Sequence, residues 1–158
     1  MVILKTAREL AVMRQAGRIS ARALQLAGEA VKPGVSTEEI DRIAYEYIVG
    51  QGATPSFLGY NGFPKTACIS INDEVIHGIP DKNRILQEGD IVSIDLGACY
   101  EGYHGDNAAT FAAGRISEEA GRLLEVTEQS LYEGIRTVRE GGRIGDVGNA
   151  VQQYTEAR

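Results

Sequence analysis

The sequence predicts an α+β fold in which helices cover one face of a largely antiparallel sheet. Two observations carry this prediction. Apolar residues recur at helical spacing near both ends of the chain, and between residues 66 and 111 they alternate with the period of two that is typical of strands. The predicted order is therefore helix, helix, strands, helix, helix, which differs from the alternation of strands and helices in a parallel α/β domain.

Local signals define the predicted helices. The segments TARE (6–9) and STEE (36–39) are both capping boxes, which mark helix starts. The segment KPG (32–34) ends the first helix, because proline and glycine interrupt helical backbone. The helical pattern returns at Ser117 and is broken once, at EGG (140–142), which predicts a pair of helices at the end of the chain.

The middle of the chain contains three strand patterns: TACISIN (66–72), IVSIDLGAC (91–99) and YHGDNAATF (103–111). We expect the last two to form a hairpin that turns at Glu101–Gly102. A two-residue turn pairs residues whose numbers sum to 203, which places Asp106 opposite Gly97. Asp95 and Asp106 then lie on one face as diagonal neighbours, with backbones roughly 7–8 Å apart.

Two carboxylates on one sheet face repel each other unless a proton or a cation lies between them. In the simpler interpretation, one or both face solvent or cap nearby backbone groups. The opposite face of the first strand is apolar and the neighbours of the aspartates are small, which favours a cation site. Carboxylate oxygens suit magnesium, calcium or manganese, and a bridging carboxylate can hold two metal ions.

Composition excludes several classes of protein. The 158 residues include 22 acidic and 16 basic side chains, for a net charge of −6, which argues against a general binder of the nucleic-acid phosphate backbone. No specific nucleic-acid partner is expected. No apolar run is long enough to span a membrane, and the first residues lack the apolar core of a signal peptide. The two cysteines have no metal-type spacing. A cytoplasmic location is therefore expected.

Three segments, VMRQAG (12–17), 61–80 and 89–111, resemble the bacterial type I methionine aminopeptidases. The resemblance runs from about residue 3 to the end of the chain. It implies a pita-bread fold of the creatinase and aminopeptidase type, which is a pseudo-twofold duplication. It also implies two divalent metal ions (Co, Mn, Fe or Zn) and removal of the N-terminal methionine from peptides and nascent proteins by a metal-bridging hydroxide.

The resemblance assigns roles to individual residues. Asp95 and Asp106 resemble metal ligands, with Asp106 bridging the two ions, and His77 resembles the histidine that contacts substrate near the scissile bond. The near wall of the methionine pocket is matched by Tyr60, Phe63 and Cys68, with Phe57 at its edge.

Each assignment has an alternative from the residues alone. His77 could be a loop histidine with a structural hydrogen bond, and Tyr60 and Phe63 could simply pack a loop. Cys68 and Cys99 are expected to be small core residues, and Lys65 a solvated charge. Two further positions draw attention: His104, which shares the face of Asp106 but is not a family ligand, and Asn107, where the family more often has Ser, Thr or Ala.

Length is the main departure from the family. The remaining ligands, one histidine and two glutamates, are expected in the second half of the fold, and no histidine follows His104 here. A faint repeat agrees with this, because a shift of 107 positions aligns Ile40 with Val147 and Tyr47 with Tyr154. We expect residues 1–158 to be one incomplete domain, with 1–114 as the first pseudo-repeat and 115–158 as the helical part of the second.

Such a chain is expected to be inactive alone and to self-associate through its cut sheet edge. The alternative is a non-catalytic pita-bread module that binds a protein partner.

Overall fold

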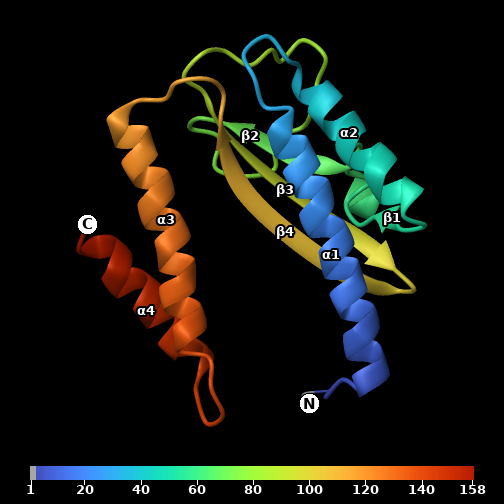
Figure 1. The fold of residues 1–158 in the computed structure, drawn as a ribbon, viewed down its shortest axis with the longest axis vertical. Helices are drawn as coiled ribbons and strands as arrows, with labels where there is room; N and C mark the ends of the chain where they lie inside the picture. The colour runs from blue at the N-terminus through green and yellow to red at the C-terminus, as the bar shows by residue number, and fades with distance from the viewer. Residues whose placement is uncertain (1–2) are drawn as a thin grey trace. The chain divides into compact units, whose positions relative to one another are not determined.

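The computed structural model describes residues 3–158 and confirms the predicted order of elements (Figure 1). The chain divides into two compact units, one ending at Arg115 and one comprising Ile116–Arg158. The first unit contains α1 (Ala7–Glu29), α2 (Thr37–Gly50), β1 (Thr54–Pro55), the 3-10 turn η1 (Tyr60–Gly62), β2 (Ala67–Ile71), β3 (Ile91–Tyr100) and β4 (Tyr103–Ala112). The second contains α3 (Glu118–Arg136) and α4 (Ile144–Glu156).

The sheet is organised around β3, and all of its pairings are antiparallel. One edge of β3 pairs with β4, and the other pairs first with β2 and then with β1. The predicted hairpin register is confirmed, with Gly97 opposite Asp106. The turn residues Glu101 and Gly102 have φ values of 47° and 81°. Positive φ at both positions is the signature of a type I′ turn, whose twist matches that of the strands.

One face of β3 forms the centre of the core. Val92, Ile94, Leu96 and Ala98 are all fully buried, and α1 and α2 contribute the facing side chains, such as Ile19 and Ile40. Helix α1 contacts both β3 and β4 along its length (Figure 1). The apolar face predicted from the alternation is therefore the face that the helices cover, which leaves the aspartate face of the sheet on the other side.

Polar contacts fasten α1 to the hairpin. The Thr6–Glu9 capping box is present, with both reciprocal hydrogen bonds. The Tyr103 hydroxyl donates to Glu9 Oε1 over 2.8 Å, so the start of β4 is tied to the start of α1. These bonds lower the pKa of Glu9 to about 2, chiefly through the Thr6 backbone amide. In the second predicted capping box, Ser36 accepts from the Glu39 amide, as expected of its first half.

Helix α2 is joined to the beginning of β2 by charged side chains. Asp41 is buried and accepts hydrogen bonds from the amides of Thr66 (2.9 Å) and Ala67 (2.8 Å). Burial raises the pKa of Asp41, against the effect of these two bonds. Lys65 forms an ion pair with Glu38 at 2.6 Å. The expectation that Lys65 is a solvated charge was wrong, because its side chain is only 24% exposed and anchors the loop before β2.

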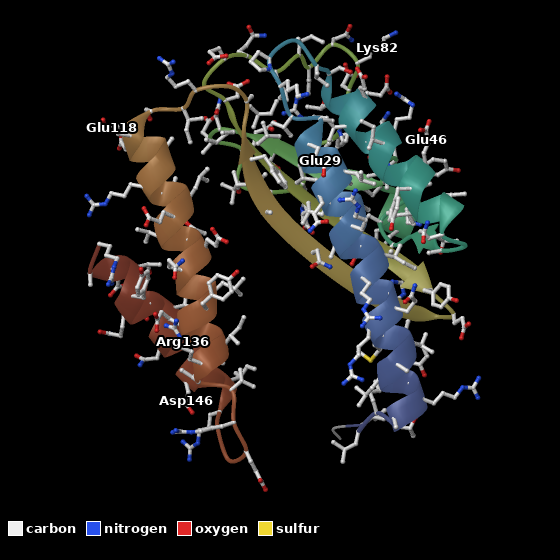
Figure 2. All side chains as sticks on the ribbon, in the orientation of Figure 1. Glu29, Glu46, Lys82, Glu118, Arg136 and Asp146 are labelled. Atoms are coloured by element: carbon white, nitrogen blue, oxygen red, sulfur yellow. The ribbon has the colours of Figure 1, made fainter. Side chains whose placement is uncertain are left out.

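Other ion pairs of the helices are solvent-exposed. Arg42 and Glu46 pair on α2 at 2.7 Å, and Arg22 reaches Glu29 on α1 at 3.4 Å; Figure 2 labels both glutamates. Exposed pairs of this kind contribute little to stability. No helix among residues 3–158 has the length and hydrophobicity needed to cross a membrane.

Several elements differ from the sequence prediction. The short strand β1 and the turn η1 were not predicted, because each contains too few residues to show a period. Helix α1 ends at Glu29, before the KPG segment. Strand β4 has one neighbour, β3, among the strands of residues 3–158, and the expected self-association at its other edge stays a prediction.

The second unit is a pair of helices, α3 and α4, that make an apolar contact at Gly134. A Cβ at this position would lie 3.1 Å from Val151 and 3.2 Å from Val147, so the absence of a side chain lets α3 and α4 approach closely. Leu123, Leu131 and Ile135 of α3 are each more than half exposed. The duplication that would relate this unit to α1 and α2 stays a prediction.

The contact between α1 and β4 yields a paired test of packing. A Cβ on Gly105 would lie 2.3 Å from the Gly17 nitrogen and 2.4 Å from the Ala16 carbonyl carbon, whereas a Cβ on Gly17 would meet nothing within 4 Å. We expect Gly105→Ala to destabilise the chain by about 3 kcal/mol, because backbone atoms must move apart. Gly17→Ala should be neutral or stabilise it by about 1 kcal/mol through helix propensity. Urea unfolding of both variants checks this, and equal effects would contradict the packing described.

Candidate functional site

Asp95 and Asp106 meet on the open face of the sheet. Asp95 lies on β3, directly opposite Cys68 of β2 and Ala108 of β4, and Asp106 lies opposite Gly97. The two aspartates are therefore on one face as diagonal neighbours, as predicted. Asp106 is exposed. Asp95 is partly buried, and its Oδ1 atom is buried without a hydrogen-bond partner.

The electrostatics of the pair favour a bound positive charge. Burial raises the pKa of Asp95, and the charge of Asp106 raises it further, as does a proton that the two carboxyls can share. The charge of His77 acts in the opposite direction. A buried carboxylate oxygen without a donor is costly unless a proton or cation satisfies it. The residues present therefore fit a divalent cation held by oxygen ligands.

The described residues supply only part of a metal centre. Among residues 3–158 there is no group of three or more His, Cys, Asp or Glu side chains placed to hold one ion. Two carboxylates leave most coordination positions to water or to other groups, so tight binding of a transition metal by these two side chains alone is not expected.

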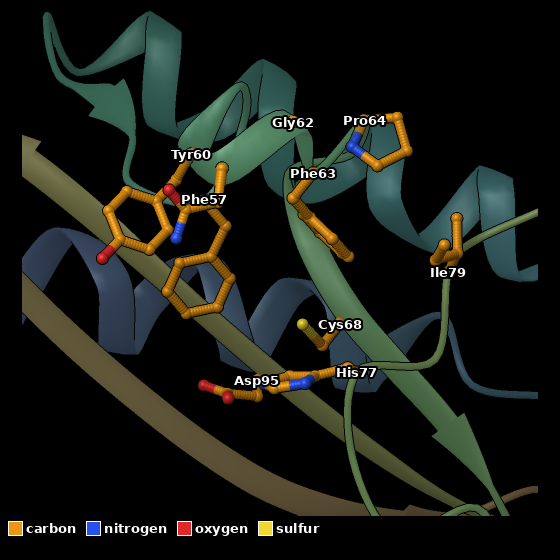
Figure 3. A pocket seen from close by; sticks show the side chains of 10 residues that line it. Phe57, Tyr60, Gly62, Phe63, Pro64, Cys68, His77, Ile79 and Asp95 are labelled. Carbon is orange, nitrogen blue, oxygen red and sulfur yellow. The ribbon is translucent and has the colours of Figure 1, made fainter.

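His77 is presented by the loop of residues 72–80, which we call the His77 loop. Its backbone has a φ of 61°, a conformation that is uncommon for residues other than glycine. The next residue, Gly78, lies against the edge of β2: its carbonyl accepts from the Ile69 amide at 2.8 Å and its amide donates to Ser70 Oγ at 3.1 Å. A Cβ at Gly78 would lie 2.2 Å from the Ile69 oxygen. This close contact with the edge of β2 holds His77 beside Asp95 in the structure (Figure 3).

A cavity of about 560 Å³ brings the predicted site residues together. Its lining includes every predicted pocket residue, Phe57, Tyr60, Phe63 and Cys68, together with His77 and Asp95. Figure 3 shows the aromatic side chains on one side of this cavity and His77 and Asp95 on the other. Asp106 is not among the lining residues. The cavity thus has apolar walls and a polar end that contains one carboxylate and one imidazole.

The aromatic wall belongs to a loop of residues 56–64, which we call the pocket loop. It is stabilised largely by its own backbone: the Gly59 amide donates to the Phe63 carbonyl at 2.8 Å, and the Phe63 amide donates to the Tyr60 carbonyl at 2.9 Å. Tyr60 is 70% exposed, so its ring forms the rim of the cavity and not its floor. The loop also contributes Asn61 and Pro64 to the lining, which the sequence did not single out.

Cys68 forms part of the cavity floor. It is buried, and burial, followed by the charge of Asp95, raises the pKa of its thiol to about 11. The thiol is therefore protonated at neutral pH and is a weak nucleophile. Cys99 is only partly buried and lies on the aspartate face opposite His104, so the expectation that it is a core residue was wrong. Both cysteines are free.

Two neighbours of Asp106 on β4 have different surroundings. Asn107 points to the helix side, where its amide nitrogen donates to Ser20 Oγ at 2.6 Å, so its departure from the family pattern does not touch the aspartate face. His104 shares the face of Asp106, and its Nδ1 forms a hydrogen bond with Ser56 Oγ at 2.8 Å. Ser56 was not singled out in the sequence analysis, because it lies 48 positions from His104 and no local pattern connects the two residues.

Residues 11–158 match the sequence profile of metallopeptidase family M24. The chain belongs to this family. It is 51% identical over 156 residues to methionine aminopeptidase 1 of Bacillus subtilis, an alignment that covers 99% of this chain and 62% of the relative. It is 44% identical over 157 residues to methionine aminopeptidase of Escherichia coli K12, covering 99% of this chain and 60% of the relative. The chain thus spans about three fifths of the length of these curated relatives.

Solved structures of a methionine aminopeptidase and of a prolidase show the same fold. The methionine aminopeptidase of Thermotoga maritima superposes with a TM-score of 0.97 at 36% identity, over 99% of this chain and 63% of that one. The prolidase of Pyrococcus furiosus superposes with a TM-score of 0.86 at 23% identity, over 98% of this chain and 44% of that one, which shows a shared fold. The pita-bread fold expected from the sequence is therefore confirmed, as a portion of the full domain.

The raised pKa of Asp95 predicts a pH-dependent effect of Asp95→Asn. Because its folded pKa lies above the unfolded value of 3.8, ionisation of Asp95 lowers stability as the pH rises through the folded pKa. The asparagine variant should therefore melt at a higher temperature than the original chain at pH 7. The difference should shrink below the unfolded value, where both side chains are neutral. Thermal melts from pH 3 to 8 measure this.

The control for that experiment is Asp73→Asn, which alters an exposed carboxylate in the His77 loop.

Millimolar Mn²⁺ should raise the melting temperature of the original chain and leave the melting temperature of the Asp95→Asn variant unchanged, because ligands that bind only the folded state stabilise it. An Asp95→Asn variant that is less stable than the original chain at pH 7 would contradict the expected cost of ionising Asp95.

Proposed function

We propose that this chain supplies the first part of the active site of a methionine aminopeptidase, which removes the N-terminal methionine from peptides and nascent proteins. The observation that carries the proposal is the cavity in which Asp95 and His77 form the polar end and aromatic side chains form the walls. The membership of the chain in metallopeptidase family M24 and its similarity to methionine aminopeptidases support peptide hydrolysis as the reaction class.

In this proposal, Asp95 and Asp106 would hold two divalent ions (Co, Mn, Fe or Zn), with Asp106 as a ligand of both. The fit rests on the unpartnered, buried Oδ1 of Asp95 and on the diagonal placement of the two carboxylates. When bound, the metal pair lowers the pKa of a water so that it can act as the nucleophile toward a peptide carbonyl. The carboxylates of this chain orient that centre at the polar end of the cavity.

The cavity suits the side chain of an N-terminal methionine. A thioether is flexible and makes favourable contacts with aromatic rings, and Phe57, Tyr60 and Phe63 provide such rings. A methionine side chain packed between them directs its α-amino group and carbonyl toward Asp95. His77 lies at the same end and can donate a hydrogen bond near the scissile bond, where charge develops on the oxygen.

Residues 3–158 alone place two carboxylates and one imidazole at this site, which supports the proposal that the isolated chain is inactive. The alternative is a pita-bread fragment that binds a protein partner without catalysis. The two functions differ in one requirement: catalysis depends on both aspartates, whereas binding of a partner through the helices or the pocket loop does not.

The test joins residues 1–158 to the C-terminal part of the Bacillus subtilis relative, which is 51% identical to this chain. We expect this chimera to release methionine from a Met-Ala-Ser peptide, and the 158-residue chain alone to release none. Asp106→Asn in the chimera should abolish turnover. His77→Ala should lower kcat by about 100-fold, within the range of groups that act in the transition state. Released methionine is measured by an amino-acid oxidase assay.

The matched control is Glu46→Gln, the same kind of carboxylate-to-amide change on the exposed face of α2. It should leave turnover unchanged. A folded chimera whose turnover is indifferent to Asp106→Asn would refute the catalytic proposal and favour the non-catalytic alternative. Full activity of the His77→Ala chimera would leave His77 as a structural loop residue.

A further inference from the structure

The pocket loop begins with a side chain that reaches across the sheet. Strand β1 pairs with β3 through Thr54 and Pro55, and the Ser56 amide continues this pairing by donating to the Gly97 carbonyl at 2.9 Å. The Ser56 hydroxyl then forms a hydrogen bond with Nδ1 of His104 at 2.8 Å. Because His104 is on β4, this bond passes over β3 and joins one edge of the sheet to the other.

The crossing depends on the missing side chain of Gly97. A Cβ at this position would lie 2.8 Å from the Ser56 Cβ and 2.9 Å from its Oγ, too close for real atoms. Any other residue at position 97 would therefore displace Ser56 from above β3. Gly97 is directly opposite Asp106, so the hydrogen bond lies next to the second aspartate.

The two ends of the pocket loop have different attachments. At its far end, Lys65 pairs with Glu38, and Asp41 accepts from the Thr66 and Ala67 amides, which ties that end to α2. At its near end, Ser56 is the residue whose side chain bonds to the sheet. Between these anchors, backbone hydrogen bonds of the loop are internal, from residue 57 to residue 63.

We propose that Ser56 and His104 are positioning residues: their hydrogen bond holds the pocket loop against the strand that carries Asp106, and so sets the distance between the aromatic wall and the carboxylates. Phe57 directly follows Ser56 and lines the cavity, so release of Ser56 lets this wall move away from Asp95 and Cys68. The hydrogen bond between Ser56 and His104 is present in the structure of this chain. Its effect on the recognition of a methionine side chain rests on the proposed function.

Cys68 reports the position of the loop without any assay of activity. It is 6% exposed and lies on the cavity floor, and the chain has one other cysteine, Cys99. In a Cys99→Ser background, the rate at which a thiol reagent modifies Cys68 measures how often the loop opens. Loss of one net hydrogen bond corresponds to an open population about fivefold larger. We expect Ser56→Ala and His104→Ala each to speed labelling by about this factor.

Two further variants separate positioning from general destabilisation. His104→Asn keeps a polar atom near the position of Nδ1 and should restore slow labelling. The double variant Ser56→Ala/His104→Ala should label no faster than either single variant, because one bond is lost in all three. Thr110→Val is the matched control: it breaks the 2.9 Å hydrogen bond between Ser93 and Thr110 on the same sheet face and should leave labelling unchanged.

Labelling rates that are equal in the original chain and in Ser56→Ala would overturn the proposal, as would equal acceleration by Thr110→Val. If the Cys99→Ser background does not fold, hydrogen–deuterium exchange of amides 57–63 in the chain with both cysteines gives the same test.

In the active chimera, Ser56→Ala should raise KM several-fold with little change in kcat. An inactive chimera with altered Cys68 labelling would refute the proposed function and support the positioning role.

Discussion

The register of the β3–β4 hairpin is the constraint on which the rest of the structure depends. A two-residue turn at Glu101 and Gly102 sets it, since both residues have positive φ and the turn allows no extra residue. A slip by one position would move Asp106 to the helix side and expose the apolar residues of one strand. With the observed register, one face of β3 is buried under α1 and α2 and the other presents Asp95 next to Asp106.

Close contacts at two glycines place the remaining groups on that face. Gly78 lies against the edge of β2 in the His77 loop, while Gly97 lies under Ser56 at the start of the pocket loop. At both positions a side chain would collide with neighbouring atoms, so the absence of one permits the close approach. The aromatic wall, His77 and Asp95 come from three separate chain segments and meet around one cavity, and Asp106 lies next to Asp95 on the same sheet face. This arrangement supports the proposal of a metal-dependent site with an apolar specificity pocket.

Local features were predictable from the sequence. The capping box at Thr6, the hairpin turn and the face shared by Asp95 and Asp106 each depend on residues close together in the chain, where periodicity and turn chemistry are informative. The features that were missed depend on distant pairs. The Lys65–Glu38 ion pair joins residues 27 positions apart, and the Ser56–His104 bond joins residues 48 positions apart. No local pattern marks such contacts. The pocket residues were identified only through the family resemblance, because aromatic residues in a loop have no periodicity.

We infer that Asp95 and Asp106 together form a divalent-cation site. Crystals of the chain soaked in Mn²⁺, with anomalous diffraction recorded near the manganese edge, test it most directly. We expect an anomalous peak between the two carboxylates, with oxygen atoms of both at about 2.0–2.3 Å, the range of such metal–oxygen bonds. A map without density there, in which the two carboxyl groups instead hydrogen-bond to each other through a shared proton, would contradict it.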